Sequence, residues 1–266
     1  MAKQIRVALS GSGFRLPAHI GALQAIDDAG YEVVEICGTS GGAIVAAMYA
    51  SGMQIHDMIN IALTYDWSKI LHLDFWSGIS KGGYCSGSDL LNFLMINSSK
   101  KTFSDLKMAL KIVSSDLLTE KEVVFSSGNV PDMPVALAAR ASSSIPFVFV
   151  PVGYKNWLLV DGGCCNNIPV NHLTVDKVPR LGIYLTSEDP VIPEKYAGIV
   201  TMAERVVDMM LASNEAAHAD DAAGATIVRI PTDYAGSLDT KMPRDIRQRL
   251  INDGYNLTMR SLLKKG

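Results

Sequence analysis

Several features are scarce or missing in this chain of 266 residues, and each absence excludes a class of protein. The formal net charge is only -3 and the Lys and Arg residues are scattered, so the composition predicts no attraction to nucleic acid. The four cysteines lack the spacing of a zinc site, and two of them, Cys164 and Cys165, are adjacent, which suits neither a metal pair nor a disulfide framework. We therefore expect a reduced chain that needs no metal and no cofactor.

Targeting and membrane signals are also missing. No apolar run follows the charged residues at the N-terminus, so we expect no cleaved signal peptide and a cytoplasmic location, with export by a signal-independent route left open. Residues 36–55 carry no charge and are long enough to span a bilayer. Glycines and polar side chains interrupt this stretch, and we therefore expect it to be part of a soluble domain.

The order of strands and helices predicts an α/β fold. Residues 4–9 and 32–37 are expected strands, and each precedes an expected helix, at 18–29 and 41–52. This alternation is typical of a parallel sheet with right-handed crossovers. Further strands are expected at 109–114, 121–125, 147–152, 157–160, 180–185 and 225–230, and further helices at 134–143, 196–213 and 243–263. No repeat or flexible linker divides the chain, so we expect residues 1–266 to form one domain.

The sharpest chemical signal is the sequence Gly38-Thr39-Ser40-Gly41-Gly42, which lies between an expected strand and an expected helix. This is the Gly-x-Ser-x-Gly pattern of a nucleophile elbow, in which a tight turn exposes a serine hydroxyl. Glycines on either side let the strand and the helix pass close together, and the helix N-terminus favours negative charge beside the serine. We therefore predict that Ser40 is a nucleophile, supported by Gly38 and Gly41.

A serine nucleophile needs a base, and Asp161 is the best candidate. It closes an apolar strand and opens Asp161-Gly162-Gly163, where Gly162 would let the carboxylate come close to a neighbouring turn. Pairs such as Asp161 with His172 would satisfy the order of a Ser-Asp-His triad, but nothing around the histidines is typical of a catalytic loop. We expect the histidines to be structural or to lie on the surface.

A third element follows the first expected strand. In Ser10-Gly11-Ser12-Gly13-Phe14-Arg15, consecutive small residues can turn their backbone N–H groups into an anion-binding nest. A dinucleotide-binding fingerprint fits less well, because Leu16 stands where its third glycine belongs. We predict that Gly11, Ser12 and Gly13 form an oxyanion hole, with Arg15 in a supporting role.

These three motifs, in this order, resemble the patatin-like phospholipases. Ala18-His19-Ile20-Gly21, Ala141-Ser142 with Ile145-Pro146, and Asn167-Ile168-Pro169-Val170 are also similar to segments of that family. The resemblance covers about residues 4–186, and residues 187–266 are not diagnostic. It implies a three-layer α/β/α fold with a mostly parallel central sheet and a Ser40-Asp161 dyad without a catalytic histidine. It also implies hydrolysis of phospholipids, lysophospholipids or other lipid esters without calcium.

Two positions depart from the family pattern, in which glycines stand in place of Ser12 and Leu16. If Ser12 had to adopt a positive φ, the side chain would strain the loop. Acyl transfer at the same site, or a catalytically weak lipid-binding module, therefore stay as alternatives to a phospholipase A or lysophospholipase. The aromatic residues and Met95 within residues 65–100 are more typical of core packing than of contact with an acyl chain or a membrane surface.

Overall fold

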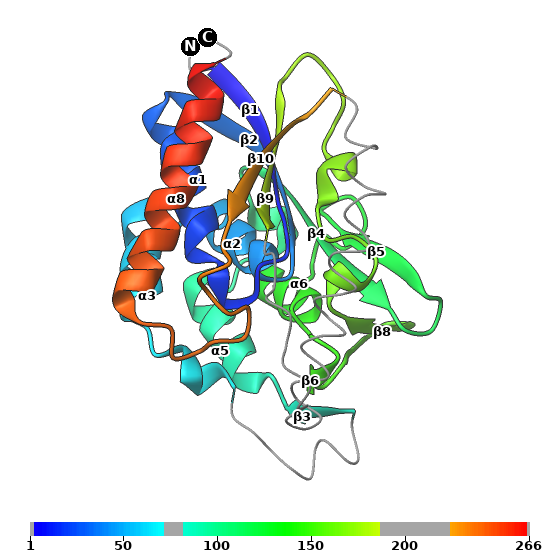
Figure 1. Cartoon of the computed structure of the whole chain (residues 1–266). Helices are drawn as coiled ribbons and strands as arrows, with labels where there is room; N and C mark the ends of the chain where they lie inside the picture. The colour runs from blue at the N-terminus through cyan, green and yellow to red at the C-terminus, as the bar shows by residue number, and fades with distance from the viewer. Residues whose placement is uncertain (1–2, 72–81, 187–223, 265–266) are drawn as a thin grey trace.

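The fold is built around one large β-sheet (Figure 1). The computed structural model describes residues 3–71, 82–186 and 224–264. The sheet has eight strands in the order β10-β9-β1-β2-β4-β8-β7, with β5 paired to β4. Its strands are β1 (Lys3–Leu9), β2 (Tyr31–Thr39), β4 (Ala109–Asp116), β5 (Lys121–Phe125), β7 (Val152–Tyr154), β8 (Trp157–Val160), β9 (Arg180–Thr186) and β10 (Thr226–Pro231).

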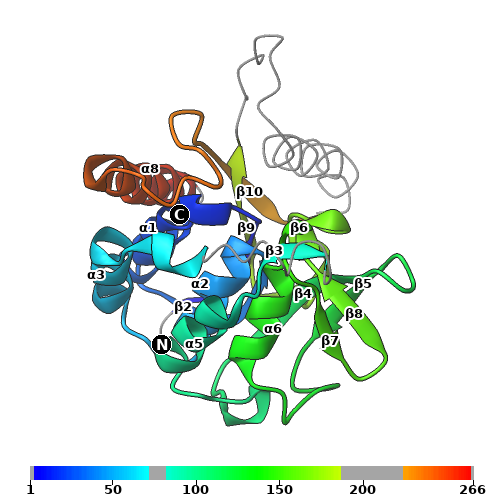
Figure 2. The same cartoon turned by 90° about the horizontal axis from the view of Figure 1, so that it is seen from below.

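The five consecutive strands β10, β9, β1, β2 and β4 are parallel, whereas β5, β7 and β8 join antiparallel. Helices pack over one face, as the view from below shows (Figure 2). They are α1 (Pro17–Asp28), α2 (Gly41–Ala50), α3 (Ile55–Thr64), α5 (Ser88–Asn97), α6 (Val135–Ser142) and α8 (Arg244–Leu263). The expected α/β class with a mostly parallel sheet flanked by helices is confirmed. The expected helix at 196–213 lies outside the described residues.

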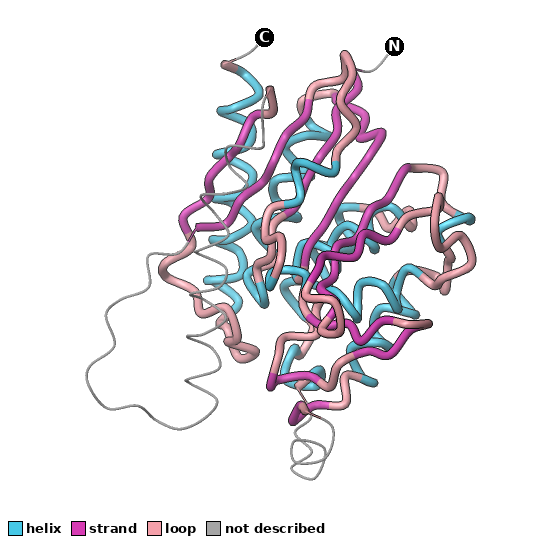
Figure 3. The backbone as a smooth tube through the Cα atoms, turned by 90° about the vertical axis from the view of Figure 1, so that its right-hand side faces the viewer, coloured by secondary structure: helices cyan, strands magenta, loops and turns pink. Residues whose placement is uncertain are grey.

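Alternation along the strands explains the two faces of the sheet. In β1, Ile5, Val7 and Leu9 belong to the large core beneath the helices, whereas Ala8 faces a smaller apolar cluster on the other side. That second face is partly covered by the segment between β8 and β9, which contains the short 3₁₀ helices η4 (Gly162–Cys164) and η5 (Pro169–His172). Figure 3 shows the backbone of the strands in magenta, with the helices in cyan and the loops in pink.

The expected single strand at 147–152 is wrong. Residues Phe147–Phe149 form β6, which pairs with β3 (Gly83–Cys85) in a separate two-stranded sheet. The chain then enters the main sheet at β7. Phe147 has a φ of 66°, and the N–H groups of Val148 and Phe149 both donate to the carbonyl of Ile145. This turn redirects the chain, and Pro151 between the two strands has no N–H to continue a ladder.

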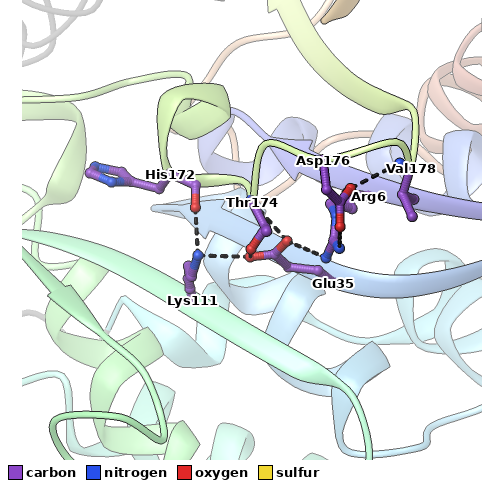
Figure 4. Close-up of polar contacts among 7 residues, drawn as sticks. All are labelled: Arg6, Glu35, Lys111, His172, Thr174, Asp176 and Val178. Atoms are coloured by element: carbon purple, nitrogen blue, oxygen red, sulfur yellow. Dashed lines mark hydrogen bonds and ion pairs between the residues drawn. The ribbon is translucent and has the colours of Figure 1, made fainter.

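A charge network ties the segment after β8 to the second face of the sheet (Figure 4). Glu35 on β2 accepts hydrogen bonds from Arg6 Nη1 and from the backbone N–H of Thr174, at 2.7 and 3.0 Å, and forms a 2.7 Å ion pair with Lys111. Arg6 also pairs with Asp176. The network therefore anchors the loop that follows η5 to three adjacent strands.

Candidate active site

The nucleophile elbow forms where β2 ends and α2 begins. Ser40 lies between them with φ 53° and ψ −124°, a backbone conformation that is strained for a residue with a side chain. A Cβ on Gly38 would lie 2.6 Å from the carbonyl oxygen of Gly42, and a Cβ on Gly42 would lie 2.4 Å from that of Ser10. Both positions must therefore be glycine for β1, β2 and α2 to meet at this turn.

Side chains from α6 and the residue after it hold the elbow in its strained conformation. The backbone N–H of Ser40 donates to Oγ of Ser142 at 2.8 Å, and Ser143 Oγ donates to the carbonyl of Ser40 at 3.1 Å. The Ser142 hydroxyl in turn donates to the carbonyl of Val113 on β4. The elbow is thus fixed to a helix and, through Ser142, to a strand, both of which lie far along the chain from Ser40.

Asp161 meets Ser40 across this turn. Ser40 Oγ donates to Asp161 Oδ2 at 2.7 Å, and Oδ1 accepts the backbone N–H of Gly163 at 2.8 Å. Asp161 is 2 % exposed, and burial raises the pKa of its carboxyl to about 6. The two hydrogen bonds favour the charged form and lower the pKa, but burial has the larger effect. A carboxylate with such a pKa can accept a proton near neutral pH.

Close packing brings the Asp161 segment to the elbow. A Cβ on Gly162 would lie 2.1 Å from the carbonyl oxygen of Val113, so only glycine lets η4 approach β4 this closely. The backbone N–H of Asp161 donates to the carbonyl of Ser144. Arg140 fixes this serine in turn, because its guanidinium donates to Ser144 Oγ and to three backbone carbonyls of the loops around β3 and β6.

The three histidines that the structure describes do not take part in this contact. His19 is fully buried and its Nε2 lies 2.9 Å from the carbonyl of Ser10, while burial lowers its pKa to about 3 and keeps the ring neutral. His172 faces Glu122, and His56 lies on the surface beside Asp57. His72 and His218 lie outside the described residues. Within residues 3–71, 82–186 and 224–264, His, Cys, Asp and Glu side chains form no group that could hold a metal ion.

The glycine-rich loop lies beside the elbow. A Cβ on Gly41 would lie 2.3 Å from Ser12 Oγ and 2.6 Å from the carbonyl oxygen of Gly13. The Gly11 N–H is engaged, since it donates to both the backbone and side-chain oxygens of Asn167. Within the described part of the chain, the N–H groups of Ser12 and Gly13 have no hydrogen-bond acceptor. They are therefore available to an incoming anion.

The strain considered for Ser12 is absent. Its φ is −149°, and the positive φ of the loop, 54°, falls on Gly13. Arg15 is buried and braces the loop, with Nε donating to the carbonyl of Ser12 and Nη1 to Thr232 Oγ1. The serine that departs from the family pattern is thus accommodated without a left-handed backbone.

A narrow apolar pocket opens next to Ser40. Its cavity volume is about 30 Å³, and none of its lining residues is charged. Its walls include Phe14, Leu16, Ile44, Trp67, Phe149 and Leu238. Trp67, Ile70 and Leu90 come from the segment 65–100, which therefore borders the nucleophile as well as packing into the core. Phe75 and Trp76 of that segment lie outside the described residues.

Comparison with known proteins identifies the family. A sequence model of the patatin-like phospholipases matches residues 7–174. The chain belongs to this family. It is a family of lipid hydrolases, and the expected resemblance is confirmed. Among the described residues, no helix is both long enough and apolar enough to cross a membrane.

Individual relatives show how far the similarity extends. YqhO of Bacillus subtilis is 27% identical over 275 residues, which cover 94% of each chain. The NTE family protein Rv1063c of Mycobacterium tuberculosis is 32% identical over 167 residues, 63% of this chain and 44% of that protein, so this chain spans less than half of that relative. The crystal structure of VipD from Legionella pneumophila has the same fold, with a TM-score of 0.66 at 16% identity over 99% of this chain and 67% of VipD.

Sequence reasoning did not assign roles to the residues that hold the site together. Ser142 and Asn167 lie in segments that resemble the family, and this resemblance was the one signal in the sequence that could have pointed to them. Their hydrogen bonds with Ser40 and Gly11 depend on tertiary contacts. Ser143 and Arg140 had no such signal. A hydroxyl or a guanidinium whose partners are backbone groups of distant residues leaves no spacing to recognise in the sequence.

Proposed function

We propose that this chain hydrolyses acyl esters of lipids, as a phospholipase A or lysophospholipase, through a Ser40-Asp161 dyad. The hydrogen bond of 2.7 Å between the serine hydroxyl and a buried carboxylate carries the proposal. Asp161 takes the proton of Ser40 as its oxygen attacks the ester carbonyl, which forms a tetrahedral intermediate. The proton then passes to the departing alcohol, and an acyl-enzyme remains on Ser40. Asp161 next removes a proton from water, which attacks the acyl-enzyme. The proton then passes from Asp161 to the departing Ser40 oxygen as the fatty acid is released.

The negative charge of the tetrahedral intermediate would be held by the N–H groups of Ser12 and Gly13. Both are without an acceptor among the described residues. The backbone of Gly13 and the side chain of Ser12 lie against Gly41, next to the nucleophile. The N-terminus of α2 adds a favourable dipole at the same point. Of the three residues predicted for the oxyanion hole, we propose Ser12 and Gly13 as donors and Gly11 as a residue that fixes the loop to Asn167.

The apolar pocket supports a lipid substrate. Its wall of aliphatic and aromatic side chains suits a fatty acyl chain, and it offers no charged group to a phosphate. Arg15, which the sequence suggested in a supporting role, supports the loop through Ser12 and Thr232. We therefore propose that the acyl chain occupies the pocket and that the head group stays outside it.

Release of fatty acid from phospholipid and lysophospholipid vesicles tests the proposal in wild type, Ser40→Ala and Asp161→Asn. We expect activity only in the wild type, and a fluorophosphonate adduct that mass spectrometry assigns to Ser40. Ser51→Ala is the matched control, because Ser51 is also a buried serine and follows α2 at its other end. Activity that persists in Ser40→Ala would refute the dyad. Acyl esters formed when an alcohol is added would reveal transfer in place of hydrolysis.

A further inference from the structure

Leu16 occupies a distinctive place in the pocket wall. It follows the 3₁₀ helix η1 (Gly13–Arg15), directly precedes α1, is 1 % exposed, and lines the pocket beside Ser40. A leucine at this position therefore takes up space in the pocket wall that a smaller residue would leave to a ligand.

The distance along the loop determines which part of a substrate Leu16 meets. The backbone of Gly13 lies against Gly41, immediately beside the nucleophile. Leu16 is three residues further, about 6 Å along a 3₁₀ turn. It therefore faces the acyl chain beyond the ester carbonyl and does not face the reacting atoms.

The backbone around Leu16 cannot easily withdraw the side chain. Its carbonyl accepts the N–H groups of His19 and Ile20, which open α1. The preceding residue, Arg15, is tied by its side chain to Ser12 and Thr232, and the following residue, Pro17, has a fixed φ. Leu16 is thus held from both sides.

Aromatic residues of the pocket wall are equally constrained. Phe14 and Trp67, which both line the pocket, have ring centroids 5.9 Å apart. Trp67 packs in turn against Tyr65 and Phe93, at 5.2 and 5.4 Å. Since interlocked rings leave little freedom to move, the wall cannot open to compensate for the bulk of Leu16.

We propose that Leu16 is a specificity-determining residue that limits the length of the acyl chain and makes esters of short fatty acids the preferred substrates. The inference rests on the proposed hydrolase function and goes beyond it by naming the substrate class. In an apolar pocket, space for one methylene changes discrimination by about 10- to 200-fold. Removing the Leu16 side chain should therefore shift the preference toward longer chains.

The test measures kcat/KM for the butanoyl, octanoyl and dodecanoyl esters of p-nitrophenol in wild type, Leu16→Val and Leu16→Ala. We expect the dodecanoyl-to-butanoyl ratio to rise in that order, by about tenfold or more for alanine. Leu23→Ala is the matched control, since Leu23 is a fully buried leucine of α1, the helix that follows Leu16, and does not line the pocket. Its ratio should equal that of the wild type.

Each result has a distinct meaning. A ratio that stays at the wild-type value in both Leu16 variants, while butanoyl ester is hydrolysed and Ser40 is labelled, overturns the role of Leu16 and leaves the hydrolase intact. Failure of wild type to cleave butanoyl ester or to react with a small fluorophosphonate overturns the proposed function itself. Should Leu16→Ala not fold, Leu16→Val, which removes one carbon, decides by the direction of the ratio.

Discussion

Two buried carboxylates of this molecule have opposite environments. Asp161 is 2 % exposed and accepts hydrogen bonds from uncharged donors, Ser40 and Gly163, so burial raises its pKa to about 6. Glu35 is 1 % exposed, and burial alone would raise its pKa as well. Hydrogen bonds from Lys111 and Thr174 outweigh burial and lower the pKa of Glu35.

The comparison separates stability from reactivity. The cations around Glu35 keep it ionised, and it ties three strands to the loop after η5 (Figure 4). Asp161 is left with neutral partners at the end of β8, and its carboxylate keeps the basicity that a general base needs. The same functional group therefore serves as an anchor in one place and is suited to proton transfer in the other, because the donors around it differ.

The largest expected effect comes from Asp161→Asn. Hydrolysis should fall by about 10⁴-fold or more, since the amide cannot accept the Ser40 proton.

The same variant should also change stability. Because the pKa of Asp161 is raised in the fold, its charge costs stability above pH 6, and the variant should be more stable than wild type there by about 3 kcal/mol. The gain should vanish below about pH 4, where the carboxyl is protonated in both the folded and the unfolded state. Urea unfolding across this pH range measures it, and a variant destabilised at pH 8 would contradict the account.

Glu35→Gln should have the opposite profile. Loss of the charge leaves Arg6 and Lys111 without their shared partner, and we expect a loss of about 3 kcal/mol at pH 7. Because the pKa of Glu35 is lowered in the fold, this contribution is present above its unfolded value and disappears as the pH falls through its folded value. Asp176→Asn is the control, since Asp176 is exposed and its ion pair with Arg6 should contribute less to stability than the buried charge of Glu35. Equal losses in the two variants would remove the distinction between them.

Ser142→Ala should lower activity more than stability. The substitution removes the acceptor of the Ser40 N–H and the donor to Val113, so the elbow loses its link to α6. We expect kcat to fall by about 10- to 100-fold while KM changes little, because the nucleophile is displaced and the pocket is retained. Ser114→Ala, at a buried serine of β4 with no described hydrogen-bond partner, should leave kcat unchanged. A change confined to KM would argue against a positioning role.

The smallest effect concerns pH. If Asp161 must be ionised to act, kcat/KM should fall as the pH drops through about 6, by about tenfold for each unit below it. His19, the buried histidine next to this site, has its pKa lowered to about 3 and would not contribute an inflection between pH 5 and 8. A rate that is constant from pH 8 to pH 5 would show that the carboxylate is not the base.

Local patterns predicted the framework well. The expected strands at 4–9, 32–37 and 180–185 correspond to β1, β2 and β9, and the expected helices at 18–29 and 41–52 to α1 and α2. These segments are strongly apolar, and glycines or a proline stand close to their ends, so local preference and tertiary packing agree. The parallel pairing of β1 with β2 also followed from the β-α-β order.

Prediction failed where tertiary contacts override local preference. The run Phe147-Val148-Phe149-Val150 has strong strand character, but a turn from Ile145 and a positive φ at Phe147 divide it between two sheets. The residue Phe147 is 59 % exposed, so burial does not stabilise the extended conformation there. The short strand β3, with three residues, pairs only with β6 and was not predicted.

The sequence by itself determined that a serine would stand on a strained turn between a strand and a helix. The glycines on either side of Ser40 are close to it in the chain, so the motif can be recognised locally, and the turn has no room for larger residues in their place. Only the tertiary structure decided that Asp161 would meet it, that Ser142 and Asn167 would brace the two loops, and that Leu16 would face the pocket. The reason is physical: backbone preference acts over a few residues, whereas the contacts of Asp161, Ser142 and Asn167 join positions more than a hundred residues apart, and all of these contacts depend on the packing of the sheet and its covering layers.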